Sequence, residues 1–356
     1  MLQSNSLQRP PNVAAPIRIL IVDDSAVVRA ALSRIIADAP EFEVAAALDG
    51  ARRAIDWLAT SSVDVILLDV QMPGLNGIAA LPELVAASGG AHILIVSTLA
   101  GDGARATIQA LALGAADTLS KPGTAAMGRQ FGDVLIDKML RLGKAKPAAF
   151  AEVCEPLLLR RAADVPIACL AIGASTGGLH ALKDFFAALP KDFDAPILVT
   201  QHLPPIFMPF FADQLCALSG RPTHVARSGQ VIQRGEILVA PGERHLSVSR
   251  AGTVIKTMLL DHAVPSRCCP SVDPMFSSVG DVFGNGAVGI VLTGMGRDGE
   301  IGAGAIAAAG GTVIVQDAVS STIWGMPGSV ARAGLASLIA SPAELADYVV
   351  QRGAAR

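Results

Sequence analysis

Residues 171–178 read AIGASTGG, and this stretch sets the fold expected for the second half of the chain. The apolar run before it, 167–172, has the length and β-branched content of a buried strand, and 179–189 has the pattern of a helix. Ser175 therefore lies on a sharp, glycine-flanked turn from strand to helix. Such a turn pushes the hydroxyl clear of the backbone and brings the first helical amides close to a developing oxyanion. The pattern favours Ser175 as a nucleophile.

A glycine-rich turn before a helix can instead hold a phosphate, or be a turn and nothing more. The spacing here is G-x-x-x-G-G rather than the G-x-G-x-x-G of dinucleotide sites, and no Lys-Ser or Lys-Thr pair follows as a P-loop requires. The match to the G-x-S-x-G nucleophile turn is short. Residues elsewhere in the chain must decide between a nucleophile, an anion site and a plain turn.

The composition narrows the class of protein. The 356 residues suffice for two domains with sizeable cores. A net charge of −3 offers no basic face, so no nucleic-acid partner is expected. No apolar run approaches the ~20 residues that span a bilayer, and the N-terminal residues lack the apolar core of a signal peptide. We expect a cytoplasmic protein that is not embedded in a membrane, with a disordered tail over 1–15.

The five cysteines are odd in number and scattered, and none has a C-x-x-C or zinc spacing. We therefore expect reduced thiols, which agrees with a cytoplasmic location. Two of them, Cys268 and Cys269, are adjacent. Plain packing is the favoured reading of this pair, and redox sensitivity is the alternative.

Strands and helices alternate through the first domain, predicted over 16–123. The predicted strands are 17–22, 42–47, 63–68, 93–96 and 118–120, and the predicted helices include 26–37 and 51–59. This alternation predicts a parallel sheet covered by helices on both faces.

Polar side chains follow these strands at their carboxyl ends, where open α/β sheets place their sites. They are Asp23 and Asp24 after the first strand, Asp69 after the third, Ser97 after the fourth and Lys121 after the fifth. Three carboxylates gathered there would repel one another without a cation, and oxygen ligands of this kind suit Mg²⁺. An aspartate can accept a phosphoryl group as an acyl phosphate, while the lysine and serine can contact its oxygens.

The order DD, D-x-x-x-P-G, S and K-P resembles that of a response-regulator receiver domain along this whole segment. The resemblance implies a flavodoxin-like (βα)5 fold in which Asp69, within LLDVQMPGLNG, is the phosphoacceptor. It implies that Asp23, Asp24, Asp69 and the Gln71 carbonyl hold Mg²⁺, and that Ser97 and Lys121 form the receiver switch. Many receivers carry an aromatic switch residue three positions before the lysine. Here that residue is Thr118, which leaves the coupling to the output surface open.

Glycine, alanine and lysine dominate 124–165, which we predict to be an interdomain linker. Within it, 131–142 keeps an apolar stripe at helical spacing, so a short helix that docks on either domain is expected. A hinge and a solvated tether both fit this composition.

The second domain, predicted over 166–353, again alternates strands and helices, which predicts a doubly wound parallel sheet. Besides the strand before Ser175, strands are expected at 196–200, 236–240, 287–292 and 312–315, and helices at 209–218, 274–282 and 302–308.

Two further polar residues follow strands of this sheet. His202 comes after the strand at 196–200, and Asp298 lies beyond the strand at 287–292. A histidine can take the proton of Ser175 near neutral pH, and an aspartate can fix its tautomer and stabilise the imidazolium. Because all three residues follow parallel strands, they are the favoured catalytic triad.

Competing residues remain for two of these roles. His245 could be the base, although it follows a loop rather than a strand end, and Asp273 or Asp317 could be the acid, although Asp273 can simply cap a helix. The chain order Ser, His, Asp differs from the Ser, Asp, His of α/β-hydrolases, so the turn does not place the domain in that superfamily.

Six motifs of the chain, IGASTGG, QHLP, LVAPGERHL, CPSVDPMF, LTGMGRDG and WGMPG, look like those of the chemotaxis methylesterase family CheB. Together with the receiver, the likeness covers essentially the whole chain past the tail. It implies a serine carboxylic-ester hydrolase that cleaves glutamyl methyl esters on methyl-accepting chemoreceptors and often deamidates receptor glutamines. It implies Ser175 as nucleophile, His202 as base and Asp298 as orienting acid, with the Thr176 amide and the Met295 loop as oxyanion candidates. No cofactor is expected in this domain.

The resemblance also implies regulation, in which the unphosphorylated receiver covers the active site and phosphorylation of Asp69 by a chemotaxis histidine kinase loosens the interface. Cys269 is a departure, because many members carry an arginine before PSVD. It favours the alternative function, a phospho-dependent receptor-binding regulator whose output domain is catalytically weak or inactive. Charge and the lack of a helix-turn-helix pattern exclude a DNA-binding regulator.

Overall fold

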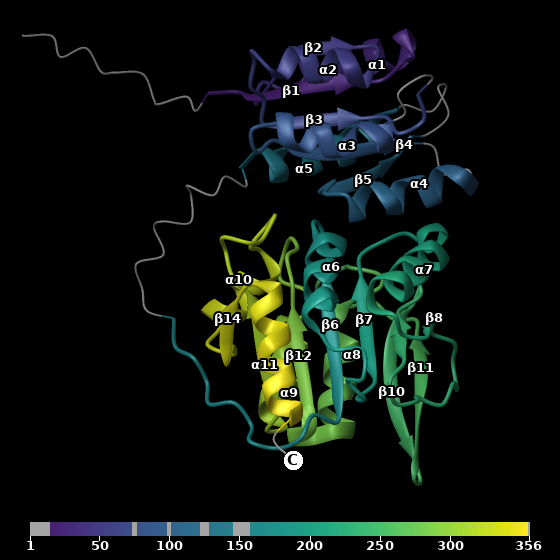
Figure 1. The fold of residues 1–356 in the computed structure, drawn as a ribbon, viewed down its shortest axis with the longest axis vertical. Coiled ribbons are helices and arrows are strands. Elements are labelled where there is room, and N and C mark those ends of the chain that lie inside the picture. The colour runs from purple at the N-terminus through teal and green to yellow at the C-terminus, as the bar shows by residue number, and fades with distance from the viewer. Residues whose placement is uncertain (1–14, 73–76, 98–100, 122–127, 145–156, 355–356) are drawn as a thin grey trace, which may run out of the picture.

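The computed structural model describes residues 15–72, 77–97, 101–121, 128–144 and 157–354. These residues form two α/β units that face each other (Figure 1). The central strands of the sheets, such as 65–68 and 197–201, are fully buried and consist mainly of Val, Ile and Leu, because helices cover both faces of each sheet. No helix in these ranges combines the length and the hydrophobicity needed to cross a bilayer.

Within the described residues, the first unit has five parallel strands and five helices. In chain order these are β1 (Ile17–Val22), α1 (Ala26–Ala37), β2 (Phe42–Leu48), α2 (Ala51–Leu58), β3 (Val65–Leu68), α3 (Gly77–Ala87), β4 (His92–Ser97), α4 (Gly101–Ala112), β5 (Asp117–Ser120) and α5 (Arg129–Lys144). The strand order is β2-β1-β3-β4-β5, with α1 and α5 on one face and α2, α3 and α4 on the other. The predicted flavodoxin-like (βα)5 fold is confirmed, and α3 and α4 are helices that the sequence pattern did not reveal.

The helix α5 belongs to this first unit. Its side chains Leu135 and Met139 are fully buried in the cluster that covers β1, β3 and β4. The sequence analysis predicted this helix over 131–142 but placed it in the linker. An apolar stripe identifies a helix that must be buried, but it does not say which sheet covers it.

The other described part of the predicted linker lies on the second unit. The amide of Arg160 donates a hydrogen bond to the carbonyl oxygen of Ala336 at 2.8 Å, and Leu157 packs on the core of that unit. We therefore propose that the first domain ends at Lys144 and the second begins at Leu157, in place of 123 and 166. The remainder of the linker, 122–127 and 145–156, and the tail over 1–14 lie outside the described residues.

The second unit is a seven-stranded parallel sheet with an added antiparallel hairpin. Its elements are β6 (Cys169–Ala174), α6 (Gly178–Ala188), β7 (Ile197–Gln201), η3 (Pro205–Phe207), α7 (Met208–Ser219), β8 (Thr223–Val225), β9 (Ile237–Val239), the hairpin β10 (His245–Ala251) and β11 (Val254–Leu260), α8 (Val272–Phe283), η4 (Gly284–Gly286), β12 (Ala287–Val291), α9 (Glu300–Ala308), β13 (Thr312–Gln316), α10 (Met326–Arg332), β14 (Leu338–Ala340) and α11 (Pro342–Ala354).

The strand order of this sheet is β14-β13-β12-β6-β7-β9-β8, so the doubly wound sheet that the sequence predicts is confirmed. The chain winds outward from β6 through β7 to β9, and then in the other direction through β12 and β13. This reversal places a crevice at the carboxyl ends of β6 and β12, the usual position of a site in an open α/β sheet.

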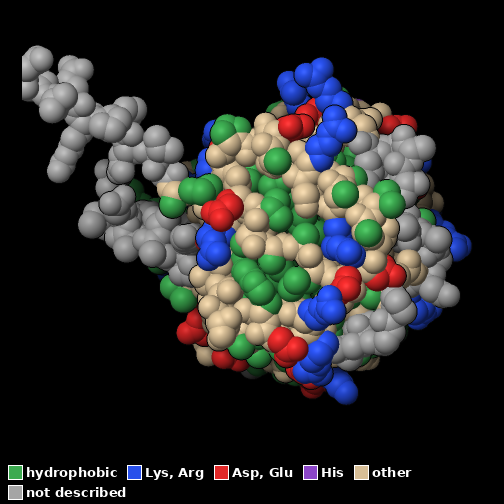
Figure 2. All heavy atoms as spheres, turned by 90° about the horizontal axis from the view of Figure 1, so that it is seen from above, with side chains coloured by type: hydrophobic (Ala, Val, Ile, Leu, Met, Phe, Trp, Pro, Cys, Tyr) green, Lys and Arg blue, Asp and Glu red, His purple; other side chains and the backbone are tan. Residues whose placement is uncertain are grey.

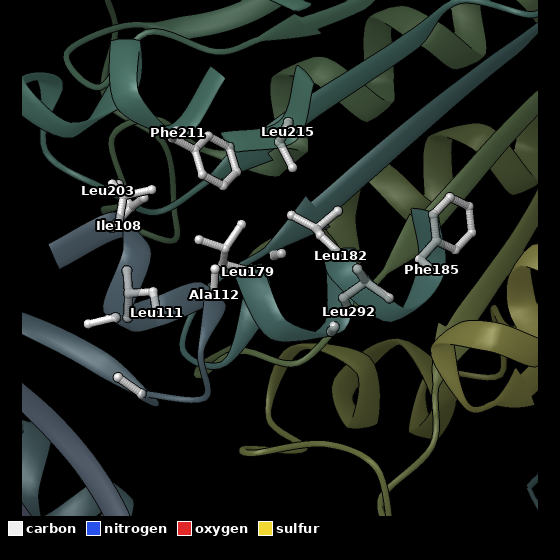
Figure 3. Close-up of a cluster of buried hydrophobic side chains, with 14 of the residues drawn as sticks. Ile108, Leu111, Ala112, Leu179, Leu182, Phe185, Leu203, Phe211, Leu215 and Leu292 are labelled. Carbon is white, nitrogen blue, oxygen red and sulfur yellow. The ribbon is translucent and has the colours of Figure 1, made fainter. Parts of the chain in front are cut away.

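The two units meet through α4, which packs on α6, α7 and η3 (Figure 1). Ile108, Leu111 and Ala112 of α4 belong to the same cluster of buried side chains as Leu179 of α6 and Leu203, and Ala112 lies beside Leu179 (Figure 3). A single hydrophobic cluster therefore runs from the first sheet into the second unit. The carboxyl end of β6 lies under this contact.

No described residue of the second unit covers the opposite end of the first unit (Figure 1). Seen from this end, apolar side chains run across the middle of the face, and charged side chains of both signs surround them (Figure 2). The edge strand β2 lies at this end, and most of its residues are half-buried or exposed.

Candidate active site and phosphoacceptor site

The turn after β6 holds the candidate nucleophile. Ser175 follows the last residue of the strand, and α6 begins three residues later at Gly178. Gly177 has a φ of 78°, in the left-handed region that favours glycine, and a Cβ there would collide with the side chain of Thr322. The predicted strand, turn and helix are present, and Ser175 is half-buried.

Two neighbouring strand ends fix the backbone of this turn. The side-chain amide of Gln201, at the end of β7, donates a hydrogen bond to the carbonyl oxygen of Ser175 at 2.8 Å. The amide of Ser175 donates to the carbonyl oxygen of Thr293 at 3.0 Å, and the Thr293 hydroxyl lies 3.0 Å from the carbonyl oxygen of Thr176. A Cβ at Gly294 would lie 2.7 Å from the Cβ of Ser175, so glycine is required for this close approach.

Two backbone amides beside the serine are open to an oxyanion. In the described ranges, neither the amide of Thr176 nor that of Met295 donates a hydrogen bond to a protein group. Met295 directly follows Gly294, which packs against Ser175. Both predicted oxyanion candidates therefore lie next to the turn with a free donor.

The histidine and the aspartate predicted for the triad are in contact. The Nε2 atom of His202 lies 2.8 Å from Oδ2 of Asp298, which is 1% exposed. The same carboxylate accepts hydrogen bonds from the Ser271 hydroxyl at 2.5 Å and from the Val272 amide at 2.7 Å. These bonds fix Asp298 against the N-terminus of α8, and Asp298 in turn fixes the imidazole ring.

Burial and hydrogen bonding shift the pKa values of His202 and Asp298 in opposite directions. Burial alone would lower the pKa of His202, but its contacts with Asp298 and with the thiol of Cys268 outweigh this effect and raise it to about 9. Burial alone would raise the pKa of Asp298, but the hydrogen bonds from His202 and Ser271 lower it to about 2. The two residues therefore form an ion pair at neutral pH.

The hydroxyl of Ser175 forms no hydrogen bond with His202 among the described residues. Catalytic hydrogen bonds are often long or absent until substrate binds. The backbone nevertheless holds the two residues close, because the amide of His202 donates to the carbonyl oxygen of Ala174 at 3.2 Å.

The competing residues have other partners. The Nε2 of His245 bonds to the carbonyl oxygen of His262 at 2.8 Å, and its Nδ1 accepts the amide of Ser271 at 3.0 Å, so both of its nitrogens are occupied. Asp273 accepts the amide of Gly302 at 2.8 Å, and burial, with the nearby charge of Asp298, raises its pKa to about 6.

The third competitor, Asp317, accepts hydrogen bonds from both the amide and the hydroxyl of Ser320, at 2.7 and 2.8 Å. Among the described residues, Asp298 is the carboxylate that contacts His202.

The predicted phosphoacceptor site lies at the carboxyl ends of β1, β3 and β5. One carboxylate oxygen from each of Asp23, Asp24 and Asp69 lies within 4.8 Å of the others. The Nζ of Lys121 is 2.5 Å from Asp23 Oδ2 and 2.6 Å from Asp69 Oδ2, and the Gln71 amide donates to Asp69 Oδ1 at 3.0 Å. Burial raises the pKa of Asp69, and the Lys121 ammonium opposes this shift. Clustered carboxylate oxygens of this kind fit Mg²⁺.

The remaining predicted receiver residues lie beside this site. Ser97 is buried at the end of β4, and its carbonyl oxygen accepts the amide of Lys121 at 2.8 Å. Thr118, which stands at the position of the usual aromatic switch residue, is buried in β5.

The first unit also contacts the nucleophile turn directly, which the sequence did not reveal. The hydroxyl of Thr176 donates to Oδ2 of Asp117 at 2.8 Å, and the amide of Gly177 donates to the carbonyl oxygen of Ala116 at 2.7 Å. Lys138 pairs with the same Asp117 oxygen at 2.7 Å. The cavity left between the two units at this point is about 10 Å³, room for about one water molecule. Ser175 is therefore closed to a substrate side chain from this direction.

A cluster of three aspartates beside a lysine in one α/β unit, and a serine turn beside a histidine–aspartate pair in the other, are the features of a response regulator with a hydrolase as its output domain. The protein-family model named response regulator receiver domain matches residues 19–130 of this chain. The family model named CheB methylesterase matches residues 170–349. The chain belongs to the CheB methylesterase family.

Relatives match along nearly the whole chain. It is 41% identical over 342 residues to "protein-glutamate methylesterase/protein-glutamine glutaminase 2" of Caulobacter vibrioides, covering 94% of this chain and 98% of the relative. It is 37% identical over 357 residues to "protein-glutamate methylesterase/protein-glutamine glutaminase" of Nitrobacter hamburgensis, covering 94% of each. The crystal structure of the Thermotoga maritima CheB methylesterase catalytic domain is similar, with 31% identity and a TM-score of 0.51, over 52% of this chain and 99% of that one.

Proposed function

We propose that this chain is a phosphorylation-activated protein-glutamate methylesterase, which hydrolyses glutamyl methyl esters on chemoreceptors to glutamate and methanol. The observation that carries the proposal is the contact between His202 and Asp298 at 2.8 Å beside the Ser175 turn. The names of the relatives supply the substrate class. The reaction takes place in the cytoplasm, where kinases find ATP.

In the proposed reaction, His202 takes the proton of Ser175 as the serine oxygen attacks the ester carbonyl. The amides of Thr176 and Met295 donate hydrogen bonds to the oxyanion, and His202 then protonates the departing methanol. Water, activated by the same histidine, attacks the acyl-enzyme and releases glutamate. Asp298 holds the ring and stabilises its positive charge.

The same steps can act on a receptor glutamine. Attack of Ser175 on the side-chain amide gives the same acyl-enzyme, and ammonia leaves in place of methanol. We include this deamidation in the proposal because the two reactions share every residue from the acyl-enzyme onward.

We propose that Asp69 accepts the phosphoryl group from a histidine kinase, with Mg²⁺ held by Asp23, Asp24, Asp69 and the Gln71 carbonyl. The ion offsets the negative charge that gathers at the phosphoryl oxygens. Once the phosphoryl group is attached to Asp69, the ammonium group of Lys121 and the hydroxyl of Ser97 donate hydrogen bonds to its oxygens.

The test of the esterase is methanol release from membranes that carry methylated receptors. The wild-type protein is expected to release methanol, and to release it faster when Mg²⁺ and a small-molecule phosphodonor are added. Release without acceleration would retain the esterase and contradict the receiver control. A folded protein that releases none in either condition would favour the receptor-binding regulator instead.

Replacing Asp69 with asparagine is expected to abolish the acceleration by phosphodonor and leave the basal rate unchanged, because the amide cannot form an acyl phosphate. The measurement is methanol release with and without phosphodonor at fixed Mg²⁺. Asp56→Asn, at an exposed position of α2, is the matched control and should respond like the wild type. An Asp69→Asn protein that still responds would place the phosphoacceptor elsewhere.

Asp117 is expected to hold the receiver on the nucleophile turn, since it accepts the Thr176 hydroxyl at 2.8 Å. A hydrogen bond to a charged group contributes about 1.5–3 kcal/mol. Asp117→Ala should therefore raise methanol release without phosphodonor about tenfold, since 1.4 kcal/mol is a factor of ten. Asp137→Ala removes a carboxylate of α5 whose ion-pair partner is Arg141, and it should leave this rate unchanged. A basal rate in Asp117→Ala equal to that of wild type would contradict the role.

A further inference from the structure

We propose that His202, Cys268 and Asp298 form a Zn²⁺ site, and that the bound ion inhibits the enzyme. One ligand atom from each residue, a ring nitrogen, a thiol sulfur and a carboxylate oxygen, lies within 4.8 Å of the other two. These are the three side-chain types that bind zinc, at about 2.0–2.3 Å. Ligands of a tetrahedral ion at these distances lie roughly 3.5 Å apart, so small rotations of the side chains suffice to close the site.

The loop before α8 holds the sulfur of Cys268 in this place. Arg267 has a φ of 58°, in the left-handed region that side-chain-bearing residues rarely adopt, and Cys268 follows it. The amide of Cys268 donates to the hydroxyl oxygen of Ser266 at 3.3 Å, and its sulfur lies 3.7 Å from the Ser266 carbonyl oxygen. The Ser266 hydroxyl lies 3.5 Å from that of Ser271, which donates to Asp298. The loop is thus fastened to the same carboxylate that orients the histidine.

Burial and charge suit a cation that enters from solvent. Asp298 is buried, whereas His202 and Cys268 are half-buried, so one side of the triangle is open to an ion and to a water molecule as fourth ligand. A thiolate and a carboxylate together balance the two charges of the ion. The sulfur also selects Zn²⁺ over the Mg²⁺ of the receiver, because Mg²⁺ binds oxygen ligands.

Zinc at this site would stop the proposed reaction. A neutral imidazole has one basic lone pair, and the ion occupies it in His202, so the ring can no longer accept the serine proton. As zinc binds, the thiol proton of Cys268 and the proton that His202 carries in its ion pair with Asp298 both leave to solvent, and the sulfur bonds as a thiolate. Through Cys268, the concentration of free Zn²⁺ would thus control the rate of the esterase. This inhibition, unlike the binding of zinc, rests on the proposed function.

The experiment uses the full-length chain after chelator treatment. Zn²⁺ binding is measured by equilibrium dialysis, and Co²⁺ is added in parallel to detect a thiolate-to-cobalt charge-transfer band. We expect the wild type to bind Zn²⁺, to show the band, and to lose methanol release in proportion to Zn²⁺ bound, with recovery after chelation. Cys268→Ala should lose the band and bind Zn²⁺ at least roughly 10–100-fold more weakly, a loss that even an outer-shell partner can produce.

Cys269→Ala is the matched control, because it removes the exposed neighbouring thiol, and it should keep the band, the binding and the inhibition. Each variant's inhibition is expressed relative to its own metal-free rate. A wild type without the band, or a Cys268→Ala protein that binds Zn²⁺ as the wild type does, would overturn the site. Binding and absorption do not need turnover, so a protein that binds Zn²⁺ through Cys268 but releases no methanol would overturn the proposed function and keep the site.

Discussion

Ser175→Ala is expected to lower kcat for methanol release by roughly 10⁴–10⁶, the loss found in serine hydrolases whose catalytic residues act as a unit. The hydroxyl is the group that forms the acyl-enzyme, and neither His202 nor the neighbouring amides can replace it. The rate that remains would come from the oxyanion donors and from substrate binding. Single-turnover methanol release from methylated receptor membranes measures the loss.

The variant should fold, because the contacts that fix this turn are made by the backbone. The carbonyl of Ser175 accepts Gln201 and its amide donates to Thr293, and alanine keeps both bonds. Unchanged thermal unfolding would therefore accompany the lost rate. Ser228→Ala, at an exposed position beyond β8, is the control and should turn over like the wild type. Near-normal turnover by Ser175→Ala would exclude it as the nucleophile.

The fold could be predicted because parallel strands buried on both faces appear as unbroken apolar runs. The runs at β3, β6 and β12 are examples, and in each the sequence soon changes to polar or glycine residues. Parallel strands also align their carboxyl ends at one edge of the sheet. The polar residues that follow the strands, His202 directly after one and Asp298 in the loop beyond another, are therefore expected to lie close together.

The helices α3 and α4 were missed for a physical reason. The first contains Pro82, and the second begins with glycines and is rich in alanine, so their apolar stripes are weak. Much of α4 is buried against the second domain, and such a tertiary surface leaves no periodic signal when its partner lies more than sixty residues away in the chain. For the same reason the contact of Asp117 with Thr176 could not be foreseen.

The sequence also does not show which of the two histidines, His202 or His245, has a ring nitrogen free to act as the base. Both residues stand in motifs and both are followed by leucine, so the sequence separates them only by position, since His202 follows a predicted strand and His245 follows a loop. The structure decides through hydrogen bonds, since His245 uses both ring nitrogens to hold two loop segments. The neighbour of His202 that sequence reasoning missed is Cys268, which was seen as half of an adjacent pair rather than as a group facing the triad.

Asp298→Asn is expected to lower kcat by about 10⁴, the loss that follows when the aspartate of a triad becomes asparagine and the geometry is kept. The side chain keeps its size, and its one oxygen can accept the hydrogen bond of either Ser271 or Val272, so we expect the fold to survive. The charge that stabilises the His202 imidazolium is lost. The amide can also hold the ring in a tautomer that cannot accept the serine proton.

The pH dependence separates this loss from a general disturbance of the site. A base must be neutral to act, and the pKa of His202 is raised to about 9, so kcat/KM of the wild type should rise with pH along a limb well above 6.5 and close to 9. In Asp298→Asn, burial still lowers the pKa while its main opposing partner is gone, so the limb should move to lower pH. Methanol release between about pH 6 and about pH 10 measures both limbs. Asp281→Asn, exposed on α8, should keep the wild-type profile. A limb that stays in place in Asp298→Asn would mean that the titrating base is not the histidine this carboxylate holds.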